Sequence, residues 1–149
     1  RMLNFPSEIS ENIVKYAYLK EYGICPKWDM KACDLIVNDK RIEVKSFSSN
    51  GPISFGPKEK WDILYIVDSK RYQQKYFIVY DIKLSNNSDI FSNIKVNKLE
   101  TFKDQCNQKR RPRIRFKELK IQLNNYINIL FINYKNEYSD KFCKKNIIY

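Results

Sequence analysis

The chain has 149 residues, with 28 Lys or Arg against 17 Asp or Glu, so its formal net charge is +11. It contains no histidine, which excludes a Ser-His-Asp triad, a histidine general base and a histidine metal ligand. Any hydrolysis must therefore use carboxylates, Lys, Tyr or a metal-bound water. The length and the 43% of hydrophobic residues predict one folded domain over residues 1–149. The basic excess favours a polyanionic partner such as DNA or RNA, although lysines that merely keep the surface soluble are the alternative.

The first predicted element is a helix over Ser7–Tyr22, with Ser7 as its N-cap. Apolar residues recur at helical spacing from Ile9 to Leu19, and Gly23 follows as a stop. Four strands are predicted after it: Cys33–Val37, Arg41–Phe47, Trp61–Asp68 and Tyr76–Lys83. The last two are nearly continuous apolar runs, as expected for central strands covered on both faces.

The polar segment Leu84–Asp89 is predicted to be a loop. The segment Val96–Arg115 has a mixed pattern, with basic residues at its centre. Phe116 to about Tyr134 is predicted to be a helix, with apolar residues on one side but many β-branched residues. A helix, four strands and at least one later helix predict an α/β or α+β sandwich.

The first two strands form a hairpin that places acidic residues together. If its loop is residues 38–39, antiparallel pairing puts Asp34 directly opposite Glu43, with Cβ atoms about 5 Å apart. Lys45 projects from the same face as Glu43, because strand side chains alternate. A longer loop would slide the register but keep the faces. The opposite face carries an apolar set suited to a core: Cys33, Leu35, Val37, Ile42 and Val44.

Two facing carboxylates repel each other, and Mg²⁺ relieves such repulsion by binding one or two carboxylates together with phosphate and water. A neighbouring lysine can orient or deprotonate the attacking water, or stabilise charge on the phosphate. The pattern thus indicates phosphodiester hydrolysis. In the alternative reading Glu43 and Lys45 form a solvated face, and Asp68 with Asp81 and Lys83 is a rival version of the motif.

Two later segments are candidates for contact with DNA. Small residues in the loop after Lys45 let the backbone approach a phosphate or a groove, although a plain connecting loop is the alternative. The basic run over residues 109–115 suits guanine and phosphate contact, and Pro112 argues against a helix interior there. If the run is extended, alternate arginines share a side; a solvated basic loop is the alternative. The candidates are Ser46, Ser48, Ser49, Asn50 and Lys58 in the first segment, and Lys109, Arg110, Arg111, Arg113 and Arg115 in the second.

Asp34 followed by Glu43-Val44-Lys45 resembles the motif of the PD-(D/E)xK nuclease superfamily. Three longer runs are similar to small type II restriction endonucleases: SENIVKYAYLKEYG, DLIVNDKRIEVKSFSSNGPISFGPKEKWD and FKDQCNQKRRPRIRF. The resemblance implies an α/β fold, restriction-endonuclease-like, with a mixed β-sheet flanked by helices. It also implies Mg²⁺-dependent cutting of double-stranded DNA by a homodimer, with a cognate DNA methyltransferase as partner.

The resemblance also assigns roles to residues. Asp34 and Glu43 would be metal ligands, and Lys45 the catalytic lysine. Glu11 would be the helical acid that supports the metal site, with Glu8 as its alternative. The sequence departs from the family's pattern at Cys33, which stands where the motif has proline. The seven residues from Ser69 to Lys75 are also too few for the crossover helix usual in the superfamily.

We therefore expect a site-specific DNA endonuclease of restriction type. A structure-specific repair or recombination nuclease and a non-enzymatic nucleic-acid-binding module are the alternatives. Four cysteines without a C-x-x-C pair make a structural zinc site unexpected. With no recognisable signal peptide or membrane-spanning run, we expect a cytoplasmic protein with reduced thiols and no membrane association.

Overall fold

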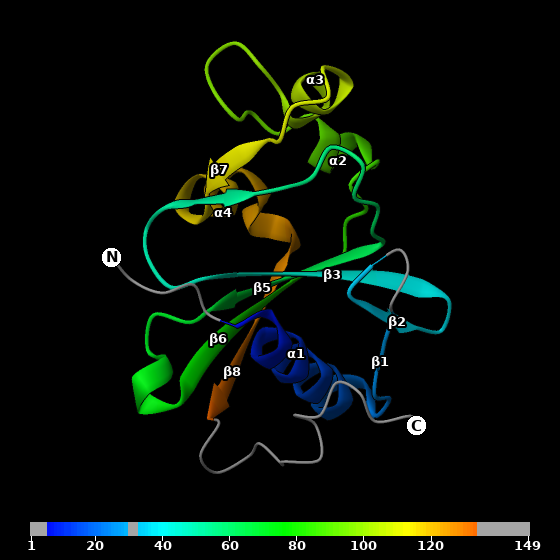
Figure 1. Ribbon diagram of the computed structural model, residues 1–149, viewed down its shortest axis with the longest axis vertical. Helices are drawn as coiled ribbons and strands as arrows, with labels where there is room; N and C mark the ends of the chain where they lie inside the picture. The colour runs from blue at the N-terminus through cyan, green and yellow to red at the C-terminus, as the bar shows by residue number, and fades with distance from the viewer. Residues whose placement is uncertain (1–5, 30–32, 134–149) are drawn as a thin grey trace.

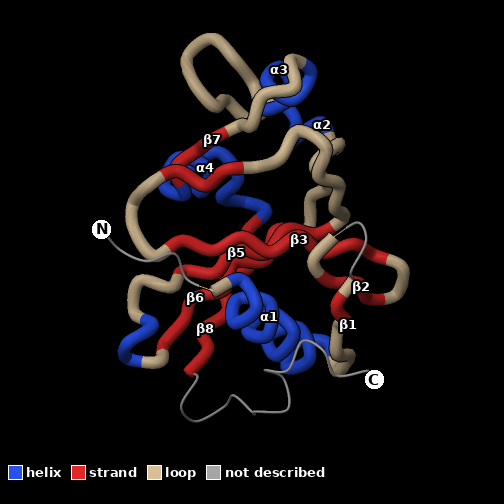
Figure 2. Tube along the Cα trace, in the orientation of Figure 1, coloured by secondary structure: helices blue, strands red, loops and turns tan. Residues whose placement is uncertain are grey.

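The computed structural model describes residues 6–29 and 33–133 and shows a mixed α/β fold (Figures 1 and 2). Its centre is a six-stranded mixed sheet in the order β1-β2-β3-β5-β6-β8, and β4 and β7 form a separate two-stranded sheet. The strands are β1 (Lys27–Trp28), β2 (Leu35–Val37), β3 (Lys40–Phe47), β4 (Pro52–Ser54), β5 (Ile63–Asp68), β6 (Tyr76–Ile82), β7 (Arg113–Arg115) and β8 (Ile127–Asn133). The helices are α1 (Ser7–Tyr22), α2 (Asp89–Ser92), α3 (Phe102–Asn107) and α4 (Phe116–Leu123), with 3₁₀ turns η1 (Tyr72–Gln74) and η2 (Asn124–Tyr126).

Helix α1 has the predicted bounds. Gly23 ends it in the left-handed conformation, with φ of 74°, and its N–H donates to the carbonyl of Leu19 at 2.8 Å. The predicted cap is wrong, because Pro6 occupies the N-cap position and Ser7 is the first helical residue. Among the described residues, no side chain caps this end.

The hairpin of β2 and β3 has the predicted two-residue loop. Asn38 and Asp39 both have positive φ, 47° and 64°, as a type I′ turn requires, and Val37 pairs with Lys40. The apolar face is buried as expected: Leu35, Val37 and Ile42 join the core beneath α1, and Val44 packs against it. Asp34 itself precedes the ladder, since β2 begins at Leu35.

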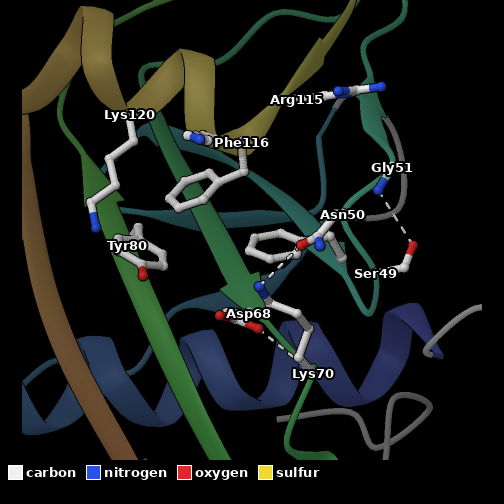
Figure 3. A pocket seen from close by; sticks show the side chains of 11 residues that line it. Ser49, Asn50, Gly51, Asp68, Lys70, Tyr80, Arg115, Phe116 and Lys120 are labelled. Carbon is white, nitrogen blue, oxygen red and sulfur yellow. Dashed lines mark hydrogen bonds between the residues drawn. The ribbon is translucent and has the colours of Figure 1, made fainter.

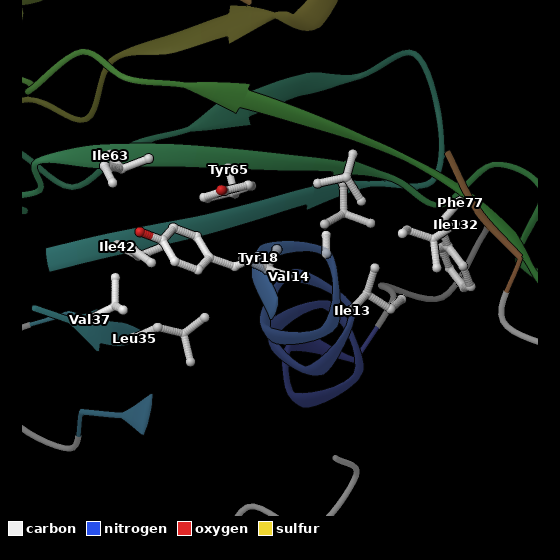
Figure 4. Close-up of a cluster of buried hydrophobic side chains, with 13 residues drawn as sticks. Ile13, Val14, Tyr18, Leu35, Val37, Ile42, Ile63, Tyr65, Phe77 and Ile132 are labelled. Atoms are coloured by element: carbon white, nitrogen blue, oxygen red, sulfur yellow. The ribbon is translucent and has the colours of Figure 1, made fainter. Parts of the chain in front are cut away.

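Each face of the sheet covers its own core. Helix α1 packs on one face (Figure 4), where Tyr18 lies beside Ile42 and Tyr65. Ile13 lies on the same face toward Phe77 and Ile132. The helices α2, α3 and α4 and the β4–β7 pair lie on the other face (Figure 1), over a core centred on Trp61. The prediction of central strands covered on both faces is confirmed by β5, whose first five residues are all buried.

The connection between β5 and β6 explains the missing crossover helix. β3 and β5 run parallel, with β4 and its loops between them in the chain, whereas β5 and β6 are antiparallel. The short segment from Ser69 to Lys75 contains η1 and simply reverses the chain.

The predicted helix from Phe116 to about Tyr134 is wrong in its second half. Helix α4 ends at Leu123, and Ile127–Asn133 form β8, which pairs with all seven residues of β6. The β-branched residues favour a strand, and the open edge of β6 supplies the hydrogen bonds that decide it. Tyr134 lies outside the described residues.

Within residues 6–29 and 33–133, no helix combines the length and apolar character needed to cross a bilayer. Cys25, Cys33 and Cys106 are free thiols, and Cys143 lies outside the described residues. Cys33, which directly precedes Asp34, is chemically quiet, because burial and the neighbouring Asp29 carboxylate raise the pKa of its thiol to about 12.

Candidate active site

Two charged side chains of strand β3, Glu43 and Lys45, point away from α1. Ile42 and Val44 face the α1 core, so alternation sends Glu43 and Lys45 to the opposite face of the sheet. On that face Lys45 lines a groove together with Ser54 of β4. Both side chains are largely enclosed, at 10% exposed for Glu43 and 16% for Lys45. Charged groups this deep need partners.

The Lys45 ammonium lies between two carboxylates. Its Nζ is 3.5 Å from Oε1 of Glu43 and donates a hydrogen bond to Oε1 of Glu59 at 3.0 Å. Nζ also lies 5.3 Å from the centre of the Phe55 ring. The charge is thus fixed in place on the face of β3 that carries Glu43.

Asp34 reaches the same place through its side chain. Its Oδ2 accepts a hydrogen bond from the backbone N–H of Val44 at 2.8 Å, which holds the carboxylate beside β3. Burial raises the pKa of Glu43 to about 8, and the negative charges of Asp34 and then Glu59 add to this, while Lys45 opposes it. The hairpin register, with Leu35 opposite Ile42, continues to Asp34 opposite Glu43, as expected.

The donor set fits magnesium bound with substrate and water. Among the residues that the structure describes, no three or more Cys, Asp or Glu side chains are grouped to hold a metal by themselves. Mg²⁺ commonly takes one or two carboxylates and completes its shell with water and phosphate oxygens. Burial is the main cause of the raised pKa of Glu43, and the carboxylates of Asp34 and Glu59 add a repulsion that a divalent cation would relieve.

Glu59 was missed in the sequence analysis. It lies in the loop between β4 and β5, and the chain folds back so that its N–H donates to the carbonyl of Gly56 at 3.2 Å. A Cβ at Gly56 would stand 2.9 Å from Oε1 of Glu59, so glycine leaves room for this side chain. An acid after a Gly-Pro turn is the only local signal, and it does not specify contact with Lys45.

The two predicted DNA-contact segments meet in one ribbon. β4 and β7 are antiparallel, with Ser54 opposite Arg113 and Pro52 opposite Arg115. Ile114 is buried in the core centred on Trp61, while Arg113 and Arg115 are exposed. The prediction that these alternate arginines share a side is confirmed for β7.

Residues 109–111 differ from one another in their surroundings. Arg111 donates to Oγ of Ser54 at 3.1 Å and lies 4.0 Å from Oε1 of Glu59, so it links the ribbon to the partner of Lys45. Arg110 forms an ion pair with Glu100 at 2.8 Å. Lys109 is exposed, with a positive φ of 60°.

A groove of about 360 Å³ runs beside Lys45. The predicted contact residues Ser46, Ser48 and Ser49 line it, together with Ser54 of β4. Lys58 is exposed, and Asn50 is exposed and accepts a hydrogen bond from Nζ of Lys70 at 3.3 Å.

A family model described as Bsp6I restriction endonuclease matches residues 1–123. This chain belongs to the Bsp6I restriction endonuclease family. The curated Type II restriction enzyme Bsp6I of Bacillus sp. (strain RFL6) is 34% identical over 115 residues, which are 76% of this chain and 63% of that protein. The chain thus spans less than two thirds of that relative's length. No solved structure matches it.

The match to the Bsp6I restriction endonuclease family includes every candidate residue described above. Glu11 and Glu8 belong to α1, which packs on the face of the sheet opposite to Glu43 and Lys45. Glu11 is buried and Glu8 half-buried. Their part in a metal site stays a prediction.

The rival motif does not assemble. Asp81 pairs with Tyr65 and Asp68 with Ile78, so the two acids stand about 10 Å apart along the sheet. Asp81 is buried, accepts a hydrogen bond from the Tyr22 hydroxyl at 3.2 Å and lies 3.9 Å from Nζ of Lys83. Burial raises its pKa, and these partners oppose that shift. The group ties β6 to the end of α1.

Proposed function

We propose that this protein is a Mg²⁺-dependent endonuclease that cuts double-stranded DNA at a specific sequence, as a type II restriction enzyme. One observation carries the proposal: the Lys45 ammonium is fixed between Glu43 and Glu59, with Asp34 beside Glu43, under a ribbon of exposed arginines. Membership of the Bsp6I restriction endonuclease family supports it.

Each residue has a distinct task in hydrolysis. Asp34 and Glu43 would hold Mg²⁺, which supplies positive charge for the phosphate and lowers the pKa of a bound water. Lys45 donates hydrogen bonds to a phosphate oxygen or to the attacking water and balances the charge that grows on the phosphate. Water adds to the phosphorus as the bond to the leaving oxygen breaks on the opposite side. Glu59 holds Lys45 in place, and Arg113 and Arg115 bind the duplex.

One such site cuts one strand. Cutting both strands therefore implies two chains related by a two-fold axis on a palindromic sequence. A cognate DNA methyltransferase, which would protect the host's own sites, follows from the same proposal.

Digestion of a supercoiled plasmid tests the activity. With Mg²⁺, we expect linear fragments whose sequenced ends share one short palindromic site, and with a chelator in place of Mg²⁺ we expect intact plasmid. Branched DNA junctions and plain duplex should be digested in parallel. Cleavage confined to junctions would identify a structure-specific nuclease instead, and the absence of cleavage on every substrate would leave a binding module.

Glu59→Gln tests the hold on Lys45. The substitution keeps a hydrogen-bond acceptor but removes the charge nearest to Nζ, which is 3.0 Å away. Because small displacements of a catalytic group are costly, we expect the single-turnover cleavage rate to fall by up to about 100-fold. DNA affinity should not fall, since Glu59 is acidic, contributes no phosphate contact and leaves the site more positive when it is neutralised. A variant with full rate and weakened DNA binding would contradict this role.

A further inference from the structure

A second hollow, of about 470 Å³, lies beyond the groove at Lys45 (Figure 3). It opens where β3 and β5 end, and α4 forms its opposite wall. Four cationic side chains line it: Lys70, Arg115, Lys117 and Lys120. Among the described residues, Asp68 is the one carboxylate in this lining, so these side chains carry a clear excess of positive charge.

Within residues 6–29 and 33–133, the four cations of this hollow lack acidic partners, since none of them forms an ion pair. Lys70 donates to the Asn50 side chain, and Asp68 accepts from the backbone N–H of Lys70 at 3.0 Å. Elsewhere on this protein, by contrast, Arg110 and Lys45 are each paired with glutamate. Unneutralised cations around a hollow attract an anion.

Aromatic rings hold the lysines in place. The Phe116 ring lies 5.0 Å from Phe47 and 4.4 Å from Tyr80, measured between ring centres. Nζ of Lys120 is 5.5 Å from the centre of Tyr80, and Nζ of Lys70 is 5.5 Å from that of Phe47. These contacts restrain the two long side chains, so less conformational entropy is lost when an anion binds.

The hollow continues from the candidate active site. It shares Phe47, Ser49 and Gly51 with the groove that Lys45 lines. Lys45 and Phe47 are two positions apart on β3, about 7 Å along the strand. A DNA strand advances about 3.4 Å per nucleotide along the duplex axis, so the hollow is a few nucleotides from the phosphate at Lys45.

We propose that this hollow binds a backbone phosphate of the DNA duplex, a few nucleotides from the phosphate that is cut. The proposal rests on the function proposed above, since its ligand is the same DNA. The contact anchors the strand without reading its sequence, because every nucleotide carries this group.

The full chain carrying Lys117→Gln and Lys120→Gln tests the contact. Glutamine keeps most of each side-chain stem, and both changes lie on α4 away from the candidate catalytic residues. Binding to a duplex that contains the cleaved site is measured by fluorescence anisotropy in a chelator, over a series of salt concentrations. We expect affinity to fall roughly tenfold, and the plot of log K against log salt to become shallower by about 1 to 2.

The matched control carries Lys20→Gln and Lys27→Gln, which remove the same charge from exposed positions outside the hollow. Its affinity for the duplex should be much closer to that of the wild type than the affinity of the Lys117→Gln, Lys120→Gln variant is. A second measurement replaces single phosphates of the duplex with neutral methylphosphonates. One replacement should weaken the wild type and leave the double variant unaffected.

Equal losses in the double variant and its control would overturn the proposal, as would a methylphosphonate scan in which every position affects both proteins alike. The proposal is also wrong if removal of a single base weakens binding of the wild type but not of the double variant, while neutralisation of a phosphate affects both proteins equally. The outcome is separable from the nuclease assignment. The nuclease assignment fails if Lys45→Ala cuts DNA normally, whereas the phosphate contact is tested by DNA binding and does not depend on cleavage.

Discussion

Lys45→Ala is expected to lower the rate of DNA cleavage in Mg²⁺ by at least about 10²–10³-fold, while DNA affinity changes by less than about threefold. The reason is the enclosed position of the ammonium, between Glu43 and Glu59, where a positive charge can serve the reacting phosphate. Single-turnover cleavage with saturating enzyme measures the chemical step, and anisotropy in a chelator measures binding.

Lys60→Ala is the matched control. Lys60 is exposed and adjoins Glu59 in the chain, and its loss removes the same charge without reaching the cluster. It should cut like the wild type. Full cleavage activity of Lys45→Ala would exclude Lys45 from the chemistry and with it the proposed active site.

Asp34→Asn should lower the rate of metal-dependent cleavage about as much as Lys45→Ala does. The amide oxygen of asparagine can still accept the Val44 N–H, now 2.8 Å from Oδ2, so the hairpin should fold as before. One of two anionic ligands is lost, and we expect at least about a tenfold weaker response to Mg²⁺. Titration of cleavage and of DNA binding with Mg²⁺ measures this, with thermal unfolding as the check on folding.

Asp39→Asn is the control for the loss of one negative charge from the hairpin. Asp39 lies in the turn of the same hairpin, is exposed and has a positive φ that asparagine tolerates well. The metal response should match that of the wild type. An unchanged metal response in Asp34→Asn would favour a binding module whose acids are incidental.

The hairpin and α1 could be predicted because short-range rules govern them. Asn38-Asp39 selects a two-residue turn, the turn sets the register, and the register places Asp34, Glu43 and Lys45. Helix α1 follows from apolar periodicity and the stop at Gly23. The roles of these residues in catalysis remain proposals.

Short-range rules do not predict contacts between residues far apart in the chain. Glu59 contacts Lys45 from 14 positions further along the chain, and β7 meets β4 across about 60 residues. Residues 127–133 carry β-branched side chains that suit a strand, but the apolar spacing continued from α4 favoured a helix. The free edge of β6 decides between them.

The amino-acid sequence limits which residue types could act here: without histidine, carboxylates and a lysine remain, and turn chemistry places three of them on one hairpin. The partners that surround them depend on the tertiary fold. Glu59, the β4–β7 ribbon and the basic hollow arise from segments far apart in the chain. They meet because burial of two cores, one on each face of the sheet, brings those segments together.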